Sequence, residues 1–276
     1  MIRPKYLAVA LVAAGAVLLA GCGDSKDNSS SASSTTAKSG SSASSGSLVA
    51  CSDIPYEPME MEATKTTTPS GYTGFDIDLA QEIATKANKK LEVKVTPFDG
   101  IFAAMDAGNC DAVISAVSMK PERKKNMDFT QAYYDSGQSL MVLKTNEAKY
   151  KTLDDLKGKN IGVQSGTTGE DYAKANTPSG ATITSLPGAA DLFAALQSGS
   201  IDAVLQDYPV NQFRAAQDDL FVVSKQFPTK EQYGMAVKKG DAATLKLLDD
   251  GITEAKANGT YATLYKKYFG EAPPNS

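Results

Sequence analysis

The sequence predicts an α/β fold made of two similar lobes, and three observations lead to this prediction. Apolar, β-branched runs alternate with stretches of helical period, which is the order of a largely parallel sheet with right-handed crossovers. The alternation breaks once, at residues 133–137, and starts again after an extended segment at residues 139–144. The two series also share a motif, FAAMDAGNCDAV at residues 102–113 and FAALQSGSIDAV at residues 193–204. Two such lobes facing one another would share a cleft, because ligands of open α/β sheets lie beyond the carboxyl ends of the strands.

The first series begins with a short apolar strand, followed by a GYTG turn and an amphipathic helix. The apolar face of this helix recurs every fourth residue, at Phe75, Leu79, Ile83 and Ala87. The expected elements are strands at residues 48–51, 91–95 and 111–115 and helices at residues 75–88 and 100–107.

The second series repeats the alternation beyond the extended segment, and two helices close the chain after another extended stretch at residues 233–237. The expected helices lie at residues 153–156, 168–175, 189–198, 208–216, 242–258 and 261–268. The expected strands lie at residues 160–164, around Ile183, and at residues 201–205 and 220–223.

The first 22 residues are typical of an export signal rather than of the fold. Two basic residues precede an apolar stretch at residues 7–19, which is too short and wrongly flanked for a membrane span. The tetrapeptide LAGC at its end resembles the bacterial lipobox, which implies cleavage before Cys22 and attachment of a lipid to its thiol. The alternative is an ordinary signal peptide with an incidental cysteine. Residues 23–47 are rich in Ser, Ala, Thr and Gly, and they predict a flexible tether.

Composition argues against several classes of site and partner. The formal net charge is -4 and no basic block occurs, which argues against nucleic-acid binding. The chain has no histidine, so Ser-His-Asp and Cys-His nucleophile systems and histidine metal sites are excluded. No G-x-x-x-x-G-K-[ST] motif occurs, and no apolar run after Leu19 approaches the length of a membrane span. We therefore expect a binding protein rather than an enzyme, with no metal and no cofactor.

Two cysteines remain beside Cys22. In an exported protein Cys51 and Cys110 can pair, but each adjoins an expected strand and can equally be a buried thiol. The sequence leaves both states open and leans slightly toward unpaired thiols.

The segment DAVISAVSMKPER, residues 111–123, has the pattern of an anion site. A β-branched strand runs into small residues, and Pro121 then stands at the expected first position of a helix that carries Arg123. Free backbone N–H groups, a helix start and a guanidinium can converge there on one carboxylate. The alternative is a surface turn whose Arg123 contacts only solvent or a nearby acid.

Two further turns of the second series follow strands in the same way. QSGTTG at residues 164–169 precedes a helix, and its small residues would let backbone N–H groups approach an anion. Asp207 also follows a strand, where it is either a helix N-cap or an acceptor for a ligand ammonium group. A carboxylate clamp together with an acid would suit a zwitterion.

Six motifs, in a fixed order, extend over nearly the whole chain after residue 47. They are GYTGFDIDLAQEIA, DAVISAVSMKPERKKNMDFTQAYYDSG, the GTT turn, IDAVLQDYP, QYGMAVKKG and NGTYATLYKKYFG. Together they resemble the polar amino-acid family of extracellular solute-binding proteins (family 3 type), which serve ABC importers, with the closest likeness to glutamine-binding members. The resemblance implies a periplasmic-binding-protein-like, Venus-flytrap fold, in which two parallel-rich sheets are joined by a two-strand hinge at residues 133–137 and 231–234. Lobe 1 would comprise residues 48–135 and 234–276, and lobe 2 residues 136–233.

The same resemblance implies a role for each matching residue. Arg123 would grip the ligand α-carboxylate, helped by the backbone N–H groups of Ser118 and Thr168. Asp207 would accept from the α-ammonium group, with the Ser118 hydroxyl nearby. Tyr56 and Phe98 would form aromatic walls, for which the alternative is an ordinary core or rim position.

The remaining matches concern the ligand side chain and two departures from the family pattern. Asp53 and Gln164 match positions that meet the ligand side chain in relatives. A glycine common in the family is Ala116 here, which we expect to tighten the pocket floor. The usual second threonine is Lys120, which either reaches the ligand side chain or, as we favour, is solvated near the helix start.

The function expected from this resemblance is that of a receptor anchored by lipid at the outer face of the cytoplasmic membrane. It would act as a monomer, bind a polar L-amino acid, with glutamine as a candidate, and deliver it to an ABC permease–ATPase complex. The alternatives are an enzyme on the same scaffold, such as a dehydratase, and a sensory or adhesive lipoprotein.

Overall fold

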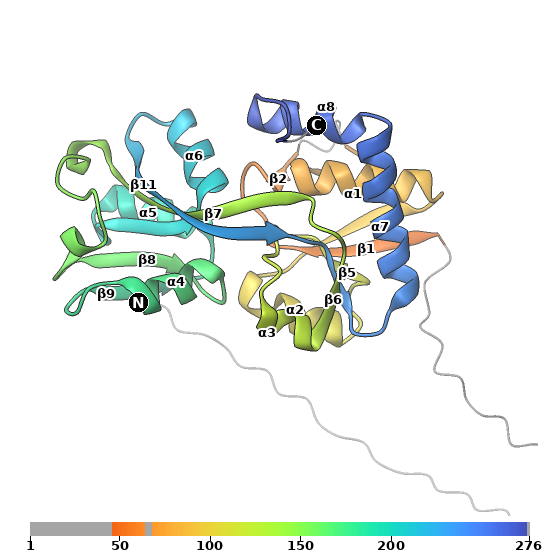
Figure 1. Ribbon diagram of the computed structural model, residues 1–276, viewed down its shortest axis with the longest axis horizontal. Coiled ribbons are helices and arrows are strands. Elements are labelled where there is room, and N and C mark those ends of the chain that lie inside the picture. Colours follow the sequence, from red (N-terminus) through yellow and green to blue (C-terminus); the bar gives the residue numbers. More distant parts are fainter. Residues whose placement is uncertain (1–45, 64–67, 275–276) are drawn as a thin grey trace, which may run out of the picture. The chain divides into compact units, whose positions relative to one another are not determined.

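The computed structural model describes residues 46–63 and 68–274. The expected export signal, Cys22 and nearly all of the expected tether lie outside these residues. The described chain is an α/β fold with two five-stranded sheets and one two-stranded sheet (Figure 1). The predicted fold class is therefore confirmed.

The first sheet has the strand order β4-β1-β5-β12-β6. Strand β1 is parallel to β4 and β5, whereas β12 is antiparallel to β5 and β6. The strands are β1 (Ser47–Ser52), β4 (Lys90–Val95), β5 (Ala112–Val113), β6 (Met127–Phe129) and β12 (Ala236–Lys238). The accompanying helices are α1 (Phe75–Lys86), α2 (Ile101–Asp106), α3 (Pro121–Asn126), α7 (Ala242–Ala257) and α8 (Thr260–Phe269), with a 3-10 turn, η1 (Phe98–Gly100).

The second sheet has the order β11-β7-β10-β8-β9, with β8 parallel to both of its neighbours. Its strands are β7 (Tyr134–Leu143), β8 (Asn160–Gln164), β9 (Thr182–Leu186), β10 (Ala203–Asp207) and β11 (Phe221–Tyr233). Its helices are α4 (Thr168–Asn176), α5 (Ala189–Ser198) and α6 (Tyr208–Gln217), with 3-10 turns η2 (Lys144–Asn146) and η3 (Asp154–Leu156). We call the first sheet with its helices lobe 1 and the second sheet with its helices lobe 2.

Each large sheet has an apolar core on both faces, because neighbouring strand residues point to opposite sides. In lobe 2, Leu140 and Val142 pack in one cluster with Ala173 of α4, and Met141 between them packs in another with Leu192 of α5. In lobe 1, Ala50 and Cys51 divide between two clusters in the same way. Burial on both faces explains why these strands are continuous apolar runs in the sequence.

Strands β7 and β11 are antiparallel partners along much of their length (Figure 1). The two crossings expected from the resemblance pair with each other, since Ser136 is opposite Glu231 and Tyr134 is opposite Tyr233. The strand expected at residues 220–223 is thus only the first part of a much longer one.

Other differences from the sequence prediction are local. The strand expected at residues 111–115 is reduced to Ala112–Val113, because Ala116 adopts a φ of 47° and turns the chain away from the sheet. The helix expected at residues 153–156 is a single 3-10 turn. The short pair β2 (Met61–Glu62) and β3 (Tyr72–Thr73) and strand β6 were not predicted.

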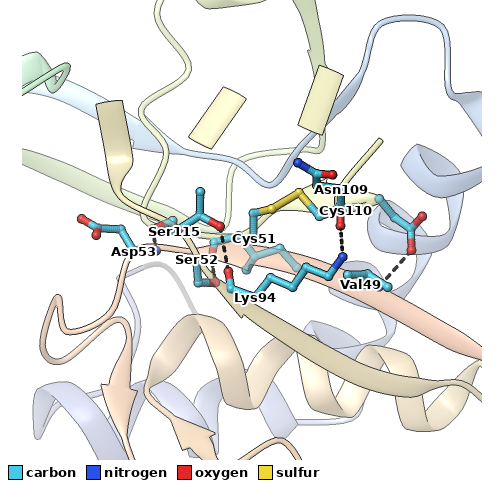
Figure 2. Close-up of a disulfide and its surroundings, with 11 residues drawn as sticks. Val49, Cys51, Ser52, Asp53, Lys94, Asn109, Cys110 and Ser115 are labelled. Carbon is cyan, nitrogen blue, oxygen red and sulfur yellow. Dashed lines mark hydrogen bonds between the residues drawn. A yellow bond between two sulfur atoms is a disulfide. The ribbon is translucent and has the colours of Figure 1, made fainter. Parts of the chain in front are cut away.

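Cys51 and Cys110 form a disulfide, so the lean toward unpaired thiols was wrong (Figure 2). Cys51 is opposite Val113 in the β1–β5 ladder, which brings it near Cys110 across a separation of 59 residues. The two Cα atoms are 5.7 Å apart, within the range that a disulfide can bridge. The bridge ties the end of β1 to the chain just before β5, and both segments lead into the site described next.

Candidate functional site

A cavity lies where the strand ends of both lobes meet. Its walls come from the segments after β1 and β5, from η1 and α3, and from the carboxyl ends of β8 and β10. The lining residues are Asp53, Tyr56, Phe98, Ser115, Ala116, Ser118, Arg123, Gln164, Thr167, Thr168 and Asp207. All eight ligand-contacting residues predicted from the sequence lie in this wall, together with the predicted floor residue Ala116.

Arg123 is the positively charged residue of this wall, and α3 holds it in place. Pro121 is at the helix start, as expected, and Arg123 is only 6% exposed. It donates to the carbonyl oxygens of Ser118 (3.0 Å) and Gly166 (3.1 Å), which belong to different lobes. Burial lowers the pKa of Arg123, while the charge of Asp207 opposes this shift. No carboxylate of residues 46–63 and 68–274 lies within 4 Å of the guanidinium, so its strongest class of partner is free to come from a ligand.

Two rings flank the same guanidinium. Its central carbon lies 5.2 Å from the ring centre of Phe98 and 5.1 Å from that of Phe102. Phe98 and Tyr56 are each 7% exposed and belong to apolar clusters of lobe 1. They are therefore core residues and walls of the cavity at once.

Asp207 ends β10 and is 6% exposed. It accepts hydrogen bonds from Gln138 Nε2 (2.6 Å) and from the Tyr233 hydroxyl. Burial raises the pKa of Asp207 to about 7, and the nearby charge of Glu231 adds to this shift against the hydrogen bonds that lower it. The side chain makes no N-cap hydrogen bond to α6, so Asp207 does not have the helix-capping role that the sequence also allowed.

Asp53 and Gln164 meet across the cavity. Gln164 Nε2 donates to Asp53 Oδ2 (2.5 Å) and to the Pro187 carbonyl oxygen (3.1 Å). Burial raises the pKa of Asp53 to about 6, the Gln164 bond lowers it, and the charges of Asp99 and Asp191 raise it. The pair links the end of β1 with the end of β8.

The hydroxyls of Ser118 and Thr168 face each other from the two lobes, with 3.5 Å between Oγ and Oγ1. Thr168 is the first residue of α4, where backbone N–H groups have no partner within the helix. Thr167 caps this helix by accepting from the Glu170 N–H (3.2 Å). The GTT turn thus provides the helix start that the sequence predicted.

The cavity floor at Ala116 is held in a left-handed conformation, with φ at 47°. Its N–H donates to the fully buried carboxyl of Asp76 (2.8 Å), which also accepts from the Tyr133 hydroxyl (2.7 Å). An alanine at this φ costs about 1–2 kcal/mol more than a glycine would. The Asp76 bond fixes the backbone N–H of this residue.

Lys120 does not line the cavity. Its Nζ pairs with Asp171 Oδ2 of α4 at 2.5 Å, an ion pair between the two lobes. Lys120 is the N-cap residue of α3, the region favoured from the sequence, and its partly exposed side chain forms this ion pair instead of being fully solvated.

Comparison with known proteins shows the family of this chain. Residues 48–271 match the bacterial extracellular solute-binding proteins, family 3. The chain belongs to this family. None of the helices in its described part is long and apolar enough to cross a membrane.

Three known proteins show how close this family 3 protein is to its relatives. The L-cystine-binding protein TcyJ of Escherichia coli (strain K12) is 35% identical over 200 residues, 72% of this chain and 74% of that protein. An ancestral arginine-binding protein bound to glutamine is 35% identical, with a TM-score of 0.76 over 82% of this chain and 99% of the other. The ancestral amino acid-binding protein AncCDT-1, a precursor of cyclohexadienyl dehydratase, is 37% identical, with a TM-score of 0.75 over 81% of this chain and 96% of the other. The predicted two-lobed, periplasmic-binding-protein-like fold is that of these structures.

Sequence reasoning missed two polar residues that contact the site of this family 3 protein, Gln138 and Glu231. Gln138 is fully buried on β7 and bonds Asp207. Glu231 was expected only as part of a hinge crossing, yet it accepts from the hydroxyls of Ser118 (2.6 Å) and Thr168 (2.5 Å). Both depend on strand pairing between distant segments, for which the sequence carries no local signal.

Proposed function

We propose that this protein is a lipid-anchored extracellular receptor that binds a polar L-amino acid between its lobes and delivers it to an ABC importer. The observation that carries the proposal is the charge pattern of the cavity. A buried guanidinium, Arg123, faces a wall that also holds the acids Asp207 and Asp53. A zwitterion presents the complementary pair of charges.

The individual roles follow from the chemistry of the wall. Arg123 binds the α-carboxylate, because two of its five N–H groups already hold backbone carbonyls and the others remain. The N–H groups of Ser118 and Thr168 assist it. Asp207 accepts from the α-ammonium group.

The remaining wall residues contact the rest of the ligand. Tyr56 and Phe98 cover its apolar part. Asp53 and Gln164 contact the end of its side chain, and they exchange their mutual hydrogen bond for bonds to it.

Ligand release requires the lobes to separate about the two crossing strands. Lobe 1 comprises residues 48–135 and 234–276, lobe 2 comprises residues 136–233, and the ligand stabilises the closed form. The pairing of β7 with β11 supports a hinge at this place. The receptor acts as a monomer, and its lobes present the loaded form to a membrane permease–ATPase complex.

A thermal-shift screen of the twenty common amino acids and cystine tests the proposal. A ligand that binds only the folded state raises the melting temperature, and calorimetry then gives its affinity. We expect one or a few polar amino acids to raise it. If none does, the proposed function is wrong.

An enzyme on the same scaffold is the second candidate. A pKa of about 7 at the buried Asp207 is in the range of a general acid, and AncCDT-1 is named as a precursor of a dehydratase. Incubation with the amino acid found in the screen, followed by mass spectrometry, separates the two. Recovery of unchanged ligand supports the receptor, and a dehydrated or cleaved product supports the enzyme.

The lipid anchor is proposed at Cys22, from the lipobox-like LAGC. Expression in a bacterial host with an alkyne-bearing palmitate tests it. We expect label on the wild type and none on Cys22→Ser; equal labelling of both would contradict the anchor.

A further inference from the structure

Glu231 lies at the cavity because of an irregularity in the β7–β11 ladder. Phe227 is opposite Gln138 and Glu231 is opposite Ser136, so the intervening residues bulge out, with Lys230 at a φ of 56°. On its other side, the chain after Glu231 pairs with lobe 1, where the Met119 N–H donates to the Gln232 carbonyl oxygen (2.9 Å). The Glu231 carboxylate is thereby held next to Ser118 of lobe 1 and Thr168 of lobe 2.

Four donors of the chain surround this carboxylate. Its Oε2 accepts from the hydroxyls of Ser118 (2.6 Å) and Thr168 (2.5 Å). Its Oε1 accepts from Gln138 Nε2 (2.8 Å) and the Thr229 hydroxyl (2.6 Å). An ionised carboxylate has about four acceptor positions, so little capacity is left for a ligand. Burial raises the pKa of Glu231, but these hydrogen bonds together outweigh it and hold the pKa below its usual range.

The bonds to Glu231 decide which way the two hydroxyls point. A hydroxyl has one proton and two lone pairs, and Ser118 and Thr168 each give their proton to Glu231. The contact between the two hydroxyls, at 3.5 Å, is much longer and does not compete. Both oxygens therefore offer only lone pairs to the cavity.

Gln138 connects Glu231 to Asp207 by donating a hydrogen bond to each carboxylate. The two protons on its Nε2 go to Asp207 Oδ1 (2.6 Å) and Glu231 Oε1 (2.8 Å), while its contact with Thr168 Oγ1, at 3.3 Å, is the longest of the three. Acceptors from Ser118, Thr168 and Asp207 consequently adjoin one another. Such a group of acceptors suits a cation with several N–H donors and repels a carboxylate.

We propose that Glu231 is a positioning residue that sets the Ser118 and Thr168 hydroxyls as acceptors for the ligand α-ammonium group. It acts through these hydroxyls without touching the ligand. The inference rests on the proposed function, and it makes the hydroxyls selective for the ammonium group while the carboxylate is left to Arg123 and to backbone N–H groups.

Glu231→Gln tests the inference, because an amide can accept one hydroxyl proton but donates to the other hydroxyl. The probes are the amino acid that gives the largest thermal shift and its des-amino analogue. For L-arginine the analogue is 5-guanidinopentanoic acid, and for L-glutamine it is 4-carbamoylbutanoic acid. We expect the amino acid to bind about 10- to 100-fold more weakly and the analogue to change less than about threefold, since bonds to charged groups carry such an effect.

Asp171→Asn is the matched control. Asp171 also raises the pKa of Arg123 by its charge, but it pairs with Lys120 and lies outside the cavity wall. We expect the ratio of the two affinities in this variant to equal that of the wild type. A similar ratio change in Asp171→Asn would mean that charge alone is responsible and would overturn the inference.

Ser118→Ala tests the hydroxyl polarity independently, should Glu231→Gln fail to fold. We expect it to weaken binding of the amino acid and to leave binding of the analogue unchanged. Where Glu231→Gln folds, the double variant should weaken binding by much less than the product of the two single effects. Equal weakening of both ligands by either variant, or no weakening, would overturn the inference. If the wild type binds no amino acid in the thermal screen, the proposed function itself fails, which is a different result.

Discussion

Gln164 of lobe 2 donates its side-chain N–H to the carboxyl of Asp53 in lobe 1, at 2.5 Å, through the cavity itself. The bond connects the ends of two strands that belong to different sheets. A ligand side chain placed here has to replace this bond. The same two residues therefore contribute both to the contact between the lobes and to ligand specificity.

The first prediction concerns the ionisation of Asp53. Burial raises its pKa to about 6, and the Gln164 bond holds it below the value that burial and the charges of Asp99 and Asp191 would give. Gln164→Ala removes this bond, so the Asp53 pKa should move further upward. Carbon-detected NMR titration of the Asp53 carboxyl measures it in the ligand-free protein. A pKa that stays the same or falls in Gln164→Ala would show that the bond does not form in solution.

The second prediction concerns the pH dependence of binding. Asp207 has a pKa raised to about 7 by burial and by Glu231, and an ammonium group requires its ionised form. Below that pH, binding must expel a proton from Asp207, so affinity should fall as pH falls, approaching about tenfold per pH unit. Above it, affinity should be flat until the ligand loses its own proton.

Calorimetry at pH 5.5, 6.5 and 8 measures this dependence, and buffers of different ionisation enthalpy report the released proton. Tighter binding at pH 5.5 than at pH 8 would contradict the assignment of Asp207 to the ammonium group. The change should be much smaller in Asp207→Asn, although its affinity is low at every pH.

The third prediction concerns Arg123, whose removal would leave a bound carboxylate without its partner. Breaking such a buried pair costs about 3–5 kcal/mol, so Arg123→Ala should bind hundreds to thousands of times more weakly. Arg123→Lys keeps the charge but cannot reach both Ser118 and Gly166 in the same planar geometry, and should be intermediate. If calorimetry gives Arg123→Ala near-normal affinity, Arg123 does not bind the ligand carboxylate.

Part of the predicted site has a local signal in the sequence, whereas the aromatic walls and the Asp53–Gln164 pair were predicted only from the family resemblance. Thr168 begins a helix after an apolar strand, Asp207 ends an apolar strand before a helix, and Arg123 follows a proline at a helix start. Because the carboxyl ends of neighbouring strands meet at one edge of a sheet, residues with this local pattern come together.

The contacts that the sequence did not predict depend on which distant segments of the chain pair with each other. Glu231 reaches Ser118 only through the register of β11 and its bulge, and Gln138 reaches Asp207 only because β7 is the antiparallel neighbour of β10. The Cys51–Cys110 disulfide likewise needs β1 and β5 side by side. Neither hydrophobic period nor composition contains this information.

The fourth prediction concerns that disulfide. It closes a loop with a sequence separation of 59 residues, and a constraint of this kind typically stabilises a fold by about 2–4 kcal/mol. The double variant Cys51→Ala/Cys110→Ala should lose that much in urea unfolding. Its amino-acid affinity should fall less than its stability, because neither cysteine lines the cavity. Unchanged stability would mean that the disulfide does not constrain the protein in solution.

The fifth prediction concerns Gly137, where β7 passes β11. A Cβ there would lie 2.8 Å from the Phe227 carbonyl oxygen, a backbone atom that can retreat only if the two strands separate. Gly137→Ala should therefore destabilise the fold by about 1–3 kcal/mol, the usual cost of overpacking. Gly100→Ala is the matched control, since a Cβ at Gly100 meets nothing within 4 Å and its φ of -105° is ordinary for alanine. Urea unfolding compares the two; equal stability of both variants would mean that β7 and β11 are not held this closely at the crossing.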